Sequence, residues 1–333
     1  MLLYYHECKV FGIKNIINCN LKRLKQKIKQ ILMHKEQHSH SDVNGKNLVI
    51  PVILNTVITV AQIIGGFLSG SMALLSDAAH NFSDVLTLIF SYIAIKLSGR
   101  GRTLKQTFGY KRAGIFAAFI NAAFLMIIAT ILIQGSVARL MAPTPIDGII
   151  VIYLAALGIL FNGASALLVK KGAKDDINVR SAYLHLFTDM LTSVAVFIGG
   201  IAITFLNVYW VDGILTIAIS IYLIYSSWGI FYAALRIFMQ FTPQHISIED
   251  IAVEITKIQG VKNIHHVHVW KLDDHEMMFE AHLDLDGDYK ISCFELILGE
   301  VGATLNRYDI HHFNIQPEWV RDDEKALINI LDH

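Results

Sequence analysis

Two pairs of ionisable residues, His80 with Asp84 and His185 with Asp189, lie inside long apolar stretches of this chain. The members of each pair are four residues apart, so on an α-helix they share one face, about 6 Å apart along the axis. Two such helices, packed face to face, would offer two imidazole nitrogens and two carboxylate oxygens, a ligand set suited to tetrahedral Zn²⁺. An ionisable group at membrane depth costs about 3 kcal/mol or more and usually marks a substrate path. The pattern predicts an intramembrane metal site; the alternative is that each pair only makes polar contacts between helices.

The composition indicates a membrane protein. Of the 333 residues, 54% are hydrophobic and 17% are charged, whereas soluble domains have about 25% charged residues. The mean hydropathy is +0.48. The formal net charge is zero, so no bulk attraction to nucleic acid is implied. The three cysteines, Cys8, Cys19 and Cys293, form no CxxC pair and no even framework, which argues against a disulfide scaffold.

Six apolar segments are long enough to cross a bilayer as helices, which takes about 20 residues each. They lie near 48–69, 72–97, 112–140, 147–169, 179–206 and 211–236, and the second and fifth contain the His–Asp pairs. We therefore expect an α-helical domain of six transmembrane helices over 47–240. A cytoplasmic N-terminal arm, 1–46, precedes it and carries a histidine tract at His34, His38 and His40. Residues 1–30 lack the sustained apolar core and cleavage site of a signal peptide.

The placement of basic residues predicts the orientation of these helices. Lys and Arg gather in the arm at 22–29 and in the connections at 96–112 and 170–180, whereas the turns at 68–71, 141–145 and 207–209 are uncharged. Because cytoplasmic loops carry the excess of Lys and Arg, both termini are expected in the cytosol. No eukaryotic targeting signal is apparent, so we expect a multi-pass protein of a bacterial inner membrane.

The composition changes after Pro243. Helices are predicted near 247–258 and 292–306, and strands near 263–271, 277–286 and 309–316. The order helix–strand–strand–helix–strand indicates a small α+β domain over 241–333, with its helices on one face of a sheet. This part is rich in histidine, at positions His265, His266, His268, His275, His282, His311 and His312.

Motifs in both parts resemble those of the cation diffusion facilitator family. Residues 76–84 read SDAAHNFSD and residues 181–189 read SAYLHLFTD, which resemble the second and fifth spans of that family. Residues 108–112, FGYKR, are similar to the start of its third span, and 260–270, 281–283 and 314–316 resemble its cytoplasmic domain. The resemblance covers roughly residues 46–319; residues 1–32 match nothing in the family, and Met33 is an alternative start.

The resemblance implies a homodimeric secondary transporter and not an enzyme: a Zn²⁺/H⁺ antiporter that exports zinc, or a related divalent ion, from the cytosol. It implies a ferredoxin-like cytoplasmic domain. It assigns the transport site to His80, Asp84, His185 and Asp189, and a second, regulatory zinc site to His265, His282, His311 and Glu318 of the cytoplasmic domain. One departure is Gly114, which stands where many members carry Glu.

The ligand chemistry by itself links metal to protons. Imidazole must be neutral and carboxylate ionised to bind metal, so protons compete with Zn²⁺ for such a site near neutral pH. Two other classes of function are disfavoured, because the two-plus-two ligand set leaves no open position, no HExxH motif occurs, and the cytoplasmic part is small for an output module. An intramembrane metalloenzyme would need an open coordination position and a general base, and a membrane metal sensor would need an output module. Two nitrogens and two oxygens favour Zn²⁺ over Cd²⁺, whereas Co²⁺ and Ni²⁺ also accept imidazole.

Overall fold

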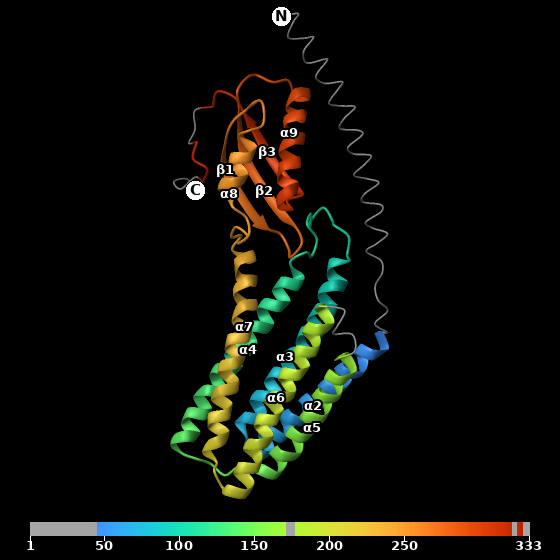
Figure 1. Ribbon diagram of the computed structural model, residues 1–333, viewed down its shortest axis with the longest axis vertical. Coiled ribbons are helices and arrows are strands. Elements are labelled where there is room, and N and C mark those ends of the chain that lie inside the picture. Colours follow the sequence, from blue (N-terminus) through green and yellow to red (C-terminus); the bar gives the residue numbers. More distant parts are fainter. Residues whose placement is uncertain (1–44, 171–176, 322–324, 329–333) are drawn as a thin grey trace, which may run out of the picture. The chain divides into compact units, whose positions relative to one another are not determined.

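The computed structural model describes residues 45–170, 177–321 and 325–328 (Figure 1). The chain forms two compact units, one built mainly on Lys46–His245 and the other mainly on Ile246–His268 and the residues from Phe279 onward. Residues 1–44, which include nearly all of the predicted N-terminal arm and its histidine tract, lie outside the described residues.

Six long helices build the first unit, which we call the helical unit. They are α2 (Gly45–Ser69), α3 (Met72–Ser98), α4 (Ala113–Met141), α5 (Gly148–Lys170), α6 (Ile177–Leu206) and α7 (Trp210–Phe238). Each predicted span coincides with one of these helices to within a few residues. Among the described residues, α4 to α7 are long and apolar enough to cross a membrane, and α2 contributes the shorter apolar helix Ile53–Ser69. A helical membrane domain with four clear apolar spans is thus confirmed, and the count of six spans stays a prediction.

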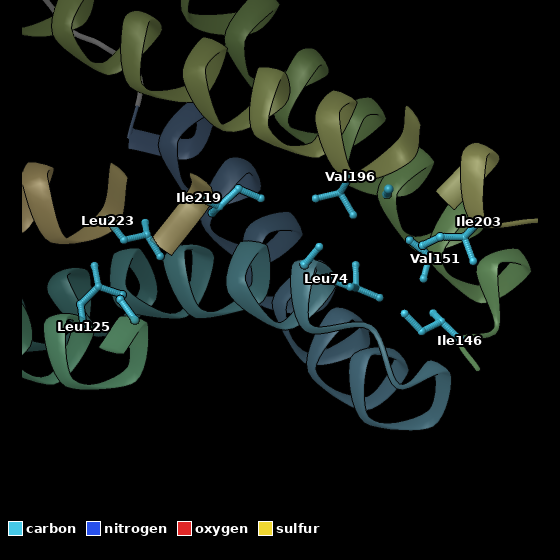
Figure 2. Close-up of a cluster of buried hydrophobic side chains, with 11 residues drawn as sticks. Leu74, Leu125, Ile146, Val151, Val196, Ile203, Ile219 and Leu223 are labelled. Atoms are coloured by element: carbon cyan, nitrogen blue, oxygen red, sulfur yellow. The ribbon is translucent and has the colours of Figure 1, made fainter. Parts of the chain in front are cut away.

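The interior of the helical unit is apolar and joins five helices. α5 packs along α6, α4 packs along α7, and α3 contacts α4, α6 and α7. Figure 2 shows the buried cluster at their centre, which includes Leu74 of α3, Leu125 of α4, Val151 of α5, Val196 of α6 and Leu223 of α7. Large apolar side chains such as Ile131, Leu160 and Ile221 are exposed on the outside. That distribution suits a bundle whose surroundings are lipid instead of water.

Glycine lets α5 and α6 approach closely. A Cβ atom on Gly148 would lie 2.2 Å from Thr204 Oγ1 and 3.0 Å from the carbonyl oxygen of Gly200. The contact with the Thr204 side chain is shorter than real Cβ atoms show and the backbone contact is tighter than most, so a side chain at Gly148 would require α5 and α6 to shift apart. The close packing keeps α6, which carries His185 and Asp189, in a fixed register against its neighbour.

The three short turns of the helical unit meet at one end. The N–H group of Asp147, before α5, donates to the carbonyl oxygen of Ser69 at the end of α2 (3.0 Å). Asp212, buried at the start of α7, accepts from Ser71 Oγ (2.5 Å) and from the N–H of Met72 (2.9 Å). Asp212 therefore satisfies donors in the first turn of α3, where the helix has no acceptor of its own. These contacts hold the starts of α3, α5 and α7 together.

The second unit, which we call the cytoplasmic unit, is a small α+β structure. It contains α8 (Ile248–Ile255), β1 (Val261–Lys271), β2 (Met277–Leu285), α9 (Ile291–Leu305) and β3 (His312–Glu318). The strands form one sheet in the order β1-β2-β3. The predicted order of helices and strands is confirmed, although β3 begins three residues later and ends two residues later than predicted. A ferredoxin-like topology stays a prediction.

Local sequence signals explain the elements of the cytoplasmic unit. Ser247 caps α8, because its Oγ accepts from the N–H of Asp250 (3.1 Å). The turn between β1 and β2 is closed by Asp273, whose Oδ1 accepts from the N–H groups of His275 (2.8 Å) and Glu276 (2.7 Å). This turn sets the register of β1 against β2, and hence which histidines share a face.

Candidate metal centres

The helical unit brings together the four residues of the two His–Asp pairs. His80 and Asp84 lie on α3, and His185 and Asp189 lie on α6. One ligand atom from each lies within 4.8 Å of all the others. Each imidazole faces the carboxylate of the other helix: Nε2 of His80 is 2.8 Å from Asp189 Oδ1, and Nε2 of His185 is 3.2 Å from Asp84 Oδ2. We call these four residues the membrane cluster.

The membrane cluster is closed on one side and open on the other. The exposed fraction of the side chain is 2% for Asp189 and 10% for His80, against 23% for Asp84 and 49% for His185. Asp84 follows His80 along α3, and His185 precedes Asp189 along α6. The two exposed ligands thus lie toward the end of α3 and the start of α6. That end is opposite the three short turns, so the cluster opens away from them.

A buried polar network lies on the closed side of the membrane cluster. Asp77 is one turn before the imidazole of α3, and its Oδ2 accepts from Gln62 Nε2 (2.7 Å) and from Ser193 Oγ (3.0 Å). Gln62 Oε1 in turn accepts from Asn81 Nδ2 (2.9 Å). A Cβ atom on Gly158 would lie 2.8 Å from Ser193 Oγ, so α5 closes over the network. These bonds join α2, α3 and α6 and fix how the ligand-bearing faces meet.

A second cluster lies in the cytoplasmic unit. His265 of β1, His282 of β2 and Glu318 of β3 each offer a ligand atom, and these atoms lie within 4.8 Å of one another. His282 Nδ1 is 3.0 Å and His265 Nε2 is 3.4 Å from the Glu318 carboxylate. Burial lowers the pKa of His282, against the opposing effect of Glu318, and so favours the neutral imidazole that a metal needs. Two imidazoles and a carboxylate fit Zn²⁺. We call these three residues the cytoplasmic cluster.

His311 is not brought to the cytoplasmic cluster. It lies just before β3, its side chain is 67% exposed, and its two ring nitrogens face Asn306 Oδ1 (2.7 Å) and Asp309 Oδ1 (3.0 Å). The position of His311 explains the difference, because it precedes β3 and its ring bonds two residues of its own turn, Asn306 and Asp309. The structure therefore gathers three of the four cytoplasmic residues expected from the resemblance.

Sequence reasoning missed the charged neighbours of the cytoplasmic cluster. Lys325 Nζ lies 2.8 Å from Asp284 Oδ1 and 3.3 Å from Glu318 Oε2, and Arg321 Nη1 lies 3.0 Å from Glu318 Oε1. Asp284 has a signal that could have been found, because it is two residues from His282 on β2 and so shares its face. Lys325 has no such signal in the sequence. It follows the last strand, and its position depends on how the chain folds back onto the sheet.

Amide side chains inside the helices bond neighbouring helices to one another. Gln62 joins α2 to α3 through Asp77, and Asn121 Nδ2 of α4 donates to Ser83 Oγ (2.8 Å) of α3. Sequence reasoning missed Asp212, although a carboxylate in an apolar span is a signal that the sequence alone provides.

Comparison with known proteins covers both units. The family model for the cation efflux transmembrane domain matches residues 48–239, and that for the cation efflux protein cytoplasmic domain matches residues 243–319. The chain is 34% identical over 284 residues to a cadmium, cobalt and zinc/H(+)-K(+) antiporter of Bacillus subtilis, covering 84% of this chain and 91% of the relative. It is 33% identical to the zinc transporter ZitB of Pectobacterium atrosepticum, covering 91% and 94%. It is 30% identical to the metal cation efflux system protein CzcD of Cupriavidus metallidurans, covering 84% and 89%. The chain therefore belongs to the cation efflux family, the cation diffusion facilitators, as its motifs indicated.

Proposed function

We propose that this protein exports Zn²⁺ from the cytosol and that the membrane cluster is its transport site. The observation that carries the proposal is the convergence of two imidazoles and two carboxylates from α3 and α6 on one point, with ligand atoms within 4.8 Å of one another. The family to which the chain belongs transports cations, and the relatives are named for zinc, cadmium and cobalt. The donor set favours zinc among these.

The burial pattern supports a transport site that opens toward the cytosol. Asp84 and His185 are the exposed ligands, and they lie at the end of the helices opposite the short uncharged turns. The basic connections lie at that same end, which the distribution of Lys and Arg assigns to the cytosol. We therefore assign this arrangement to the inward-facing state of the proposed cycle, in which zinc would reach the site past His185. Both termini are cytoplasmic in this scheme, and the bacterial inner membrane is the proposed location.

Proton antiport follows from the same ligands. Zinc binds when the imidazoles are neutral and the carboxylates ionised, so loading from the cytosol releases protons and reprotonation on the other side releases the metal. The helices would alternate between two arrangements about a fixed site, carrying metal outward and protons inward. The chain's match to the cytoplasmic domain of cation efflux proteins supports a homodimer as the working unit.

The cytoplasmic cluster is proposed to bind Zn²⁺ as a regulatory ion. Metal held there would neutralise the buried Glu318 carboxylate and tie together three strands, so the state of the cytoplasmic unit would follow the cytosolic zinc level. His265, His282 and Glu318 would be the ligands in this proposal.

A flux assay with matched variants tests the transport proposal. Sealed proteoliposomes that contain the full-length protein should take up ⁶⁵Zn²⁺. Protons should move in the opposite direction, which a pH-sensitive dye records. Asp84→Asn should lose both fluxes. Asp147→Asn makes the same chemical change at an exposed helix start, where asparagine caps equally well, and should keep both. Zinc flux at the full rate without proton movement would contradict antiport, and equal rates in the two variants would remove Asp84 from the site.

A further inference from the structure

A tail segment, residues 325–328, lies along the open edge of the cytoplasmic sheet. β1 is an outer strand, because the sheet order is β1-β2-β3. The N–H groups of His266 and Val267 donate to the carbonyl oxygens of Ala326 (3.2 Å) and Leu327 (2.9 Å). The tail therefore covers backbone groups of β1 that an outer strand otherwise leaves to solvent.

The shape of β1 allows this contact beside the cytoplasmic cluster. In a regular strand successive residues face opposite sides, so two neighbouring N–H groups do not bond the same segment. His266 has a φ of 52°, in the left-handed region, which breaks the alternation there. The irregularity directly follows His265, a member of the cluster, so the tail is bonded at the residue next to a proposed ligand.

The same tail segment brings a cation to the cytoplasmic cluster. Lys325 Nζ lies between the carboxylates of Asp284 (2.8 Å) and Glu318 (3.3 Å). The Glu318 side chain is 2% exposed and that of Asp284 is 12% exposed, whereas that of Lys325 is 35% exposed. The lysine thus neutralises buried carboxylates from the solvent side, which is the position of an exchangeable counter-ion.

We propose that Lys325 is a tethered cation that competes with the metal ion of the cytoplasmic cluster, and that metal binding releases the tail segment from β1. This inference rests on the proposed regulatory site. The Glu318 carboxylate would be shared by a divalent ion and an ammonium group, and the two positive charges repel each other at such short range. When the metal is bound, Lys325 leaves the carboxylates. The hydrogen bonds from the N–H groups of β1 to the carbonyl oxygens of the adjoining Ala326 and Leu327 then break. Lys325 would thereby set the zinc concentration at which the cytoplasmic unit responds.

The test uses the full-length protein with Asp84→Asn and Asp189→Asn, so that zinc binding reports the cytoplasmic cluster. Zn²⁺ affinity is measured by competition with a chromophoric chelator. Lys325→Gln should tighten zinc binding about tenfold, because it removes the competing charge. Lys257→Gln removes the same charge from an exposed residue after α8 and should change nothing. Lys325→Arg, which keeps the charge, should bind zinc as the parent does. Unchanged or weaker zinc binding in a folded Lys325→Gln protein would overturn the proposal.

Hydrogen exchange provides a second readout that does not depend on affinity. The amides of His266 and Val267 should exchange at least about tenfold faster when Zn²⁺ is added to the parent protein. In Lys325→Gln, and in a chain ending at Arg321, they should exchange fast before zinc is added. Slower exchange with zinc would contradict release of the tail. If His282→Ala binds zinc as tightly as its parent, the proposed regulatory site itself is wrong. That result is distinct from unchanged zinc affinity in Lys325→Gln, which would overturn only the role of the lysine.

Discussion

The membrane cluster and the cytoplasmic cluster use the same ligand types on different scaffolds. The first takes four ligands from two helices, and each imidazole faces a carboxylate of the other helix. The second takes three ligands from three strands, and its carboxylate also faces Lys325 and Arg321. A transport site must exchange metal for protons in every cycle, which paired imidazoles and carboxylates can do. A site with a competing cation, as proposed for Lys325, would respond only above a threshold concentration of metal, which suits sensing.

Removing a ligand of the membrane cluster should have the largest effect. His80→Ala and Asp189→Ala each leave three ligands, so zinc transport should fall by at least about 100-fold. Folding should survive, because each change removes a side chain without adding bulk. The measurement is the initial ⁶⁵Zn²⁺ rate in proteoliposomes, with elution volume as the check on folding. His245→Ala, an exposed histidine outside both clusters, is the matched control. A near-normal rate in either ligand variant would contradict the site.

The polar network behind the membrane cluster should matter less than the ligands. Asp77→Ala removes the acceptor shared by Gln62 and Ser193, so the transport rate should fall about tenfold. Asp77→Asn keeps an acceptor oxygen and should retain most of the rate. Zinc stoichiometry should stay at the parent value in both, because Asp77 is not a ligand. A variant that loses a bound zinc would instead make Asp77 part of the first coordination sphere.

Changing one ligand from nitrogen to oxygen should alter selectivity more than rate. His80→Asp keeps four ligands but weakens the preference for a compact tetrahedral ion, so the ratio of Cd²⁺ to Zn²⁺ transport should rise several-fold. Both ions are compared in one preparation of proteoliposomes. If the ratio does not move, the ligands of α3 do not set selectivity.

The smallest effect on transport is expected from the cytoplasmic cluster. His282→Ala should weaken zinc binding to the cytoplasmic unit and lower transport about twofold, because regulation and passage use different sites. Transport is compared at low and high cytosolic-side zinc. Complete loss of transport in this variant would show that the cytoplasmic cluster is part of the path.

The sequence predicts the membrane cluster well for a physical reason. Spacing of four residues fixes a shared helix face, and an apolar background makes His80 and Asp189 conspicuous. The pairing across helices, His80 with Asp189 and His185 with Asp84, depends on how α3 packs on α6 and is visible only in the structure. The unequal exposure of the four ligands follows from the same packing.

The cytoplasmic cluster is less predictable from the sequence. It depends on the register of the strands and on the path of the chain after β3. His265, His282 and Glu318 are far apart in sequence and meet only when β1, β2 and β3 pair in the observed order. His311, expected from the resemblance, lies before β3 and its ring bonds its own turn. Lys325 lies beyond the matched cytoplasmic domain, which ends at residue 319, so no motif indicates its role.

Metal coordination in the membrane cluster tests the central claim most directly. The full-length protein with His282→Ala and Glu318→Gln, which disable the cytoplasmic cluster, is loaded with Zn²⁺ and studied by X-ray absorption. We predict one zinc ion per chain, four-coordinate, with two imidazoles and two carboxylate oxygens at about 2.0–2.2 Å. Adding Asp189→Asn should abolish or distort that signal. A protein that binds no zinc in this form, or the same spectrum with and without Asp189→Asn, would contradict the proposal that the four residues carry the ion.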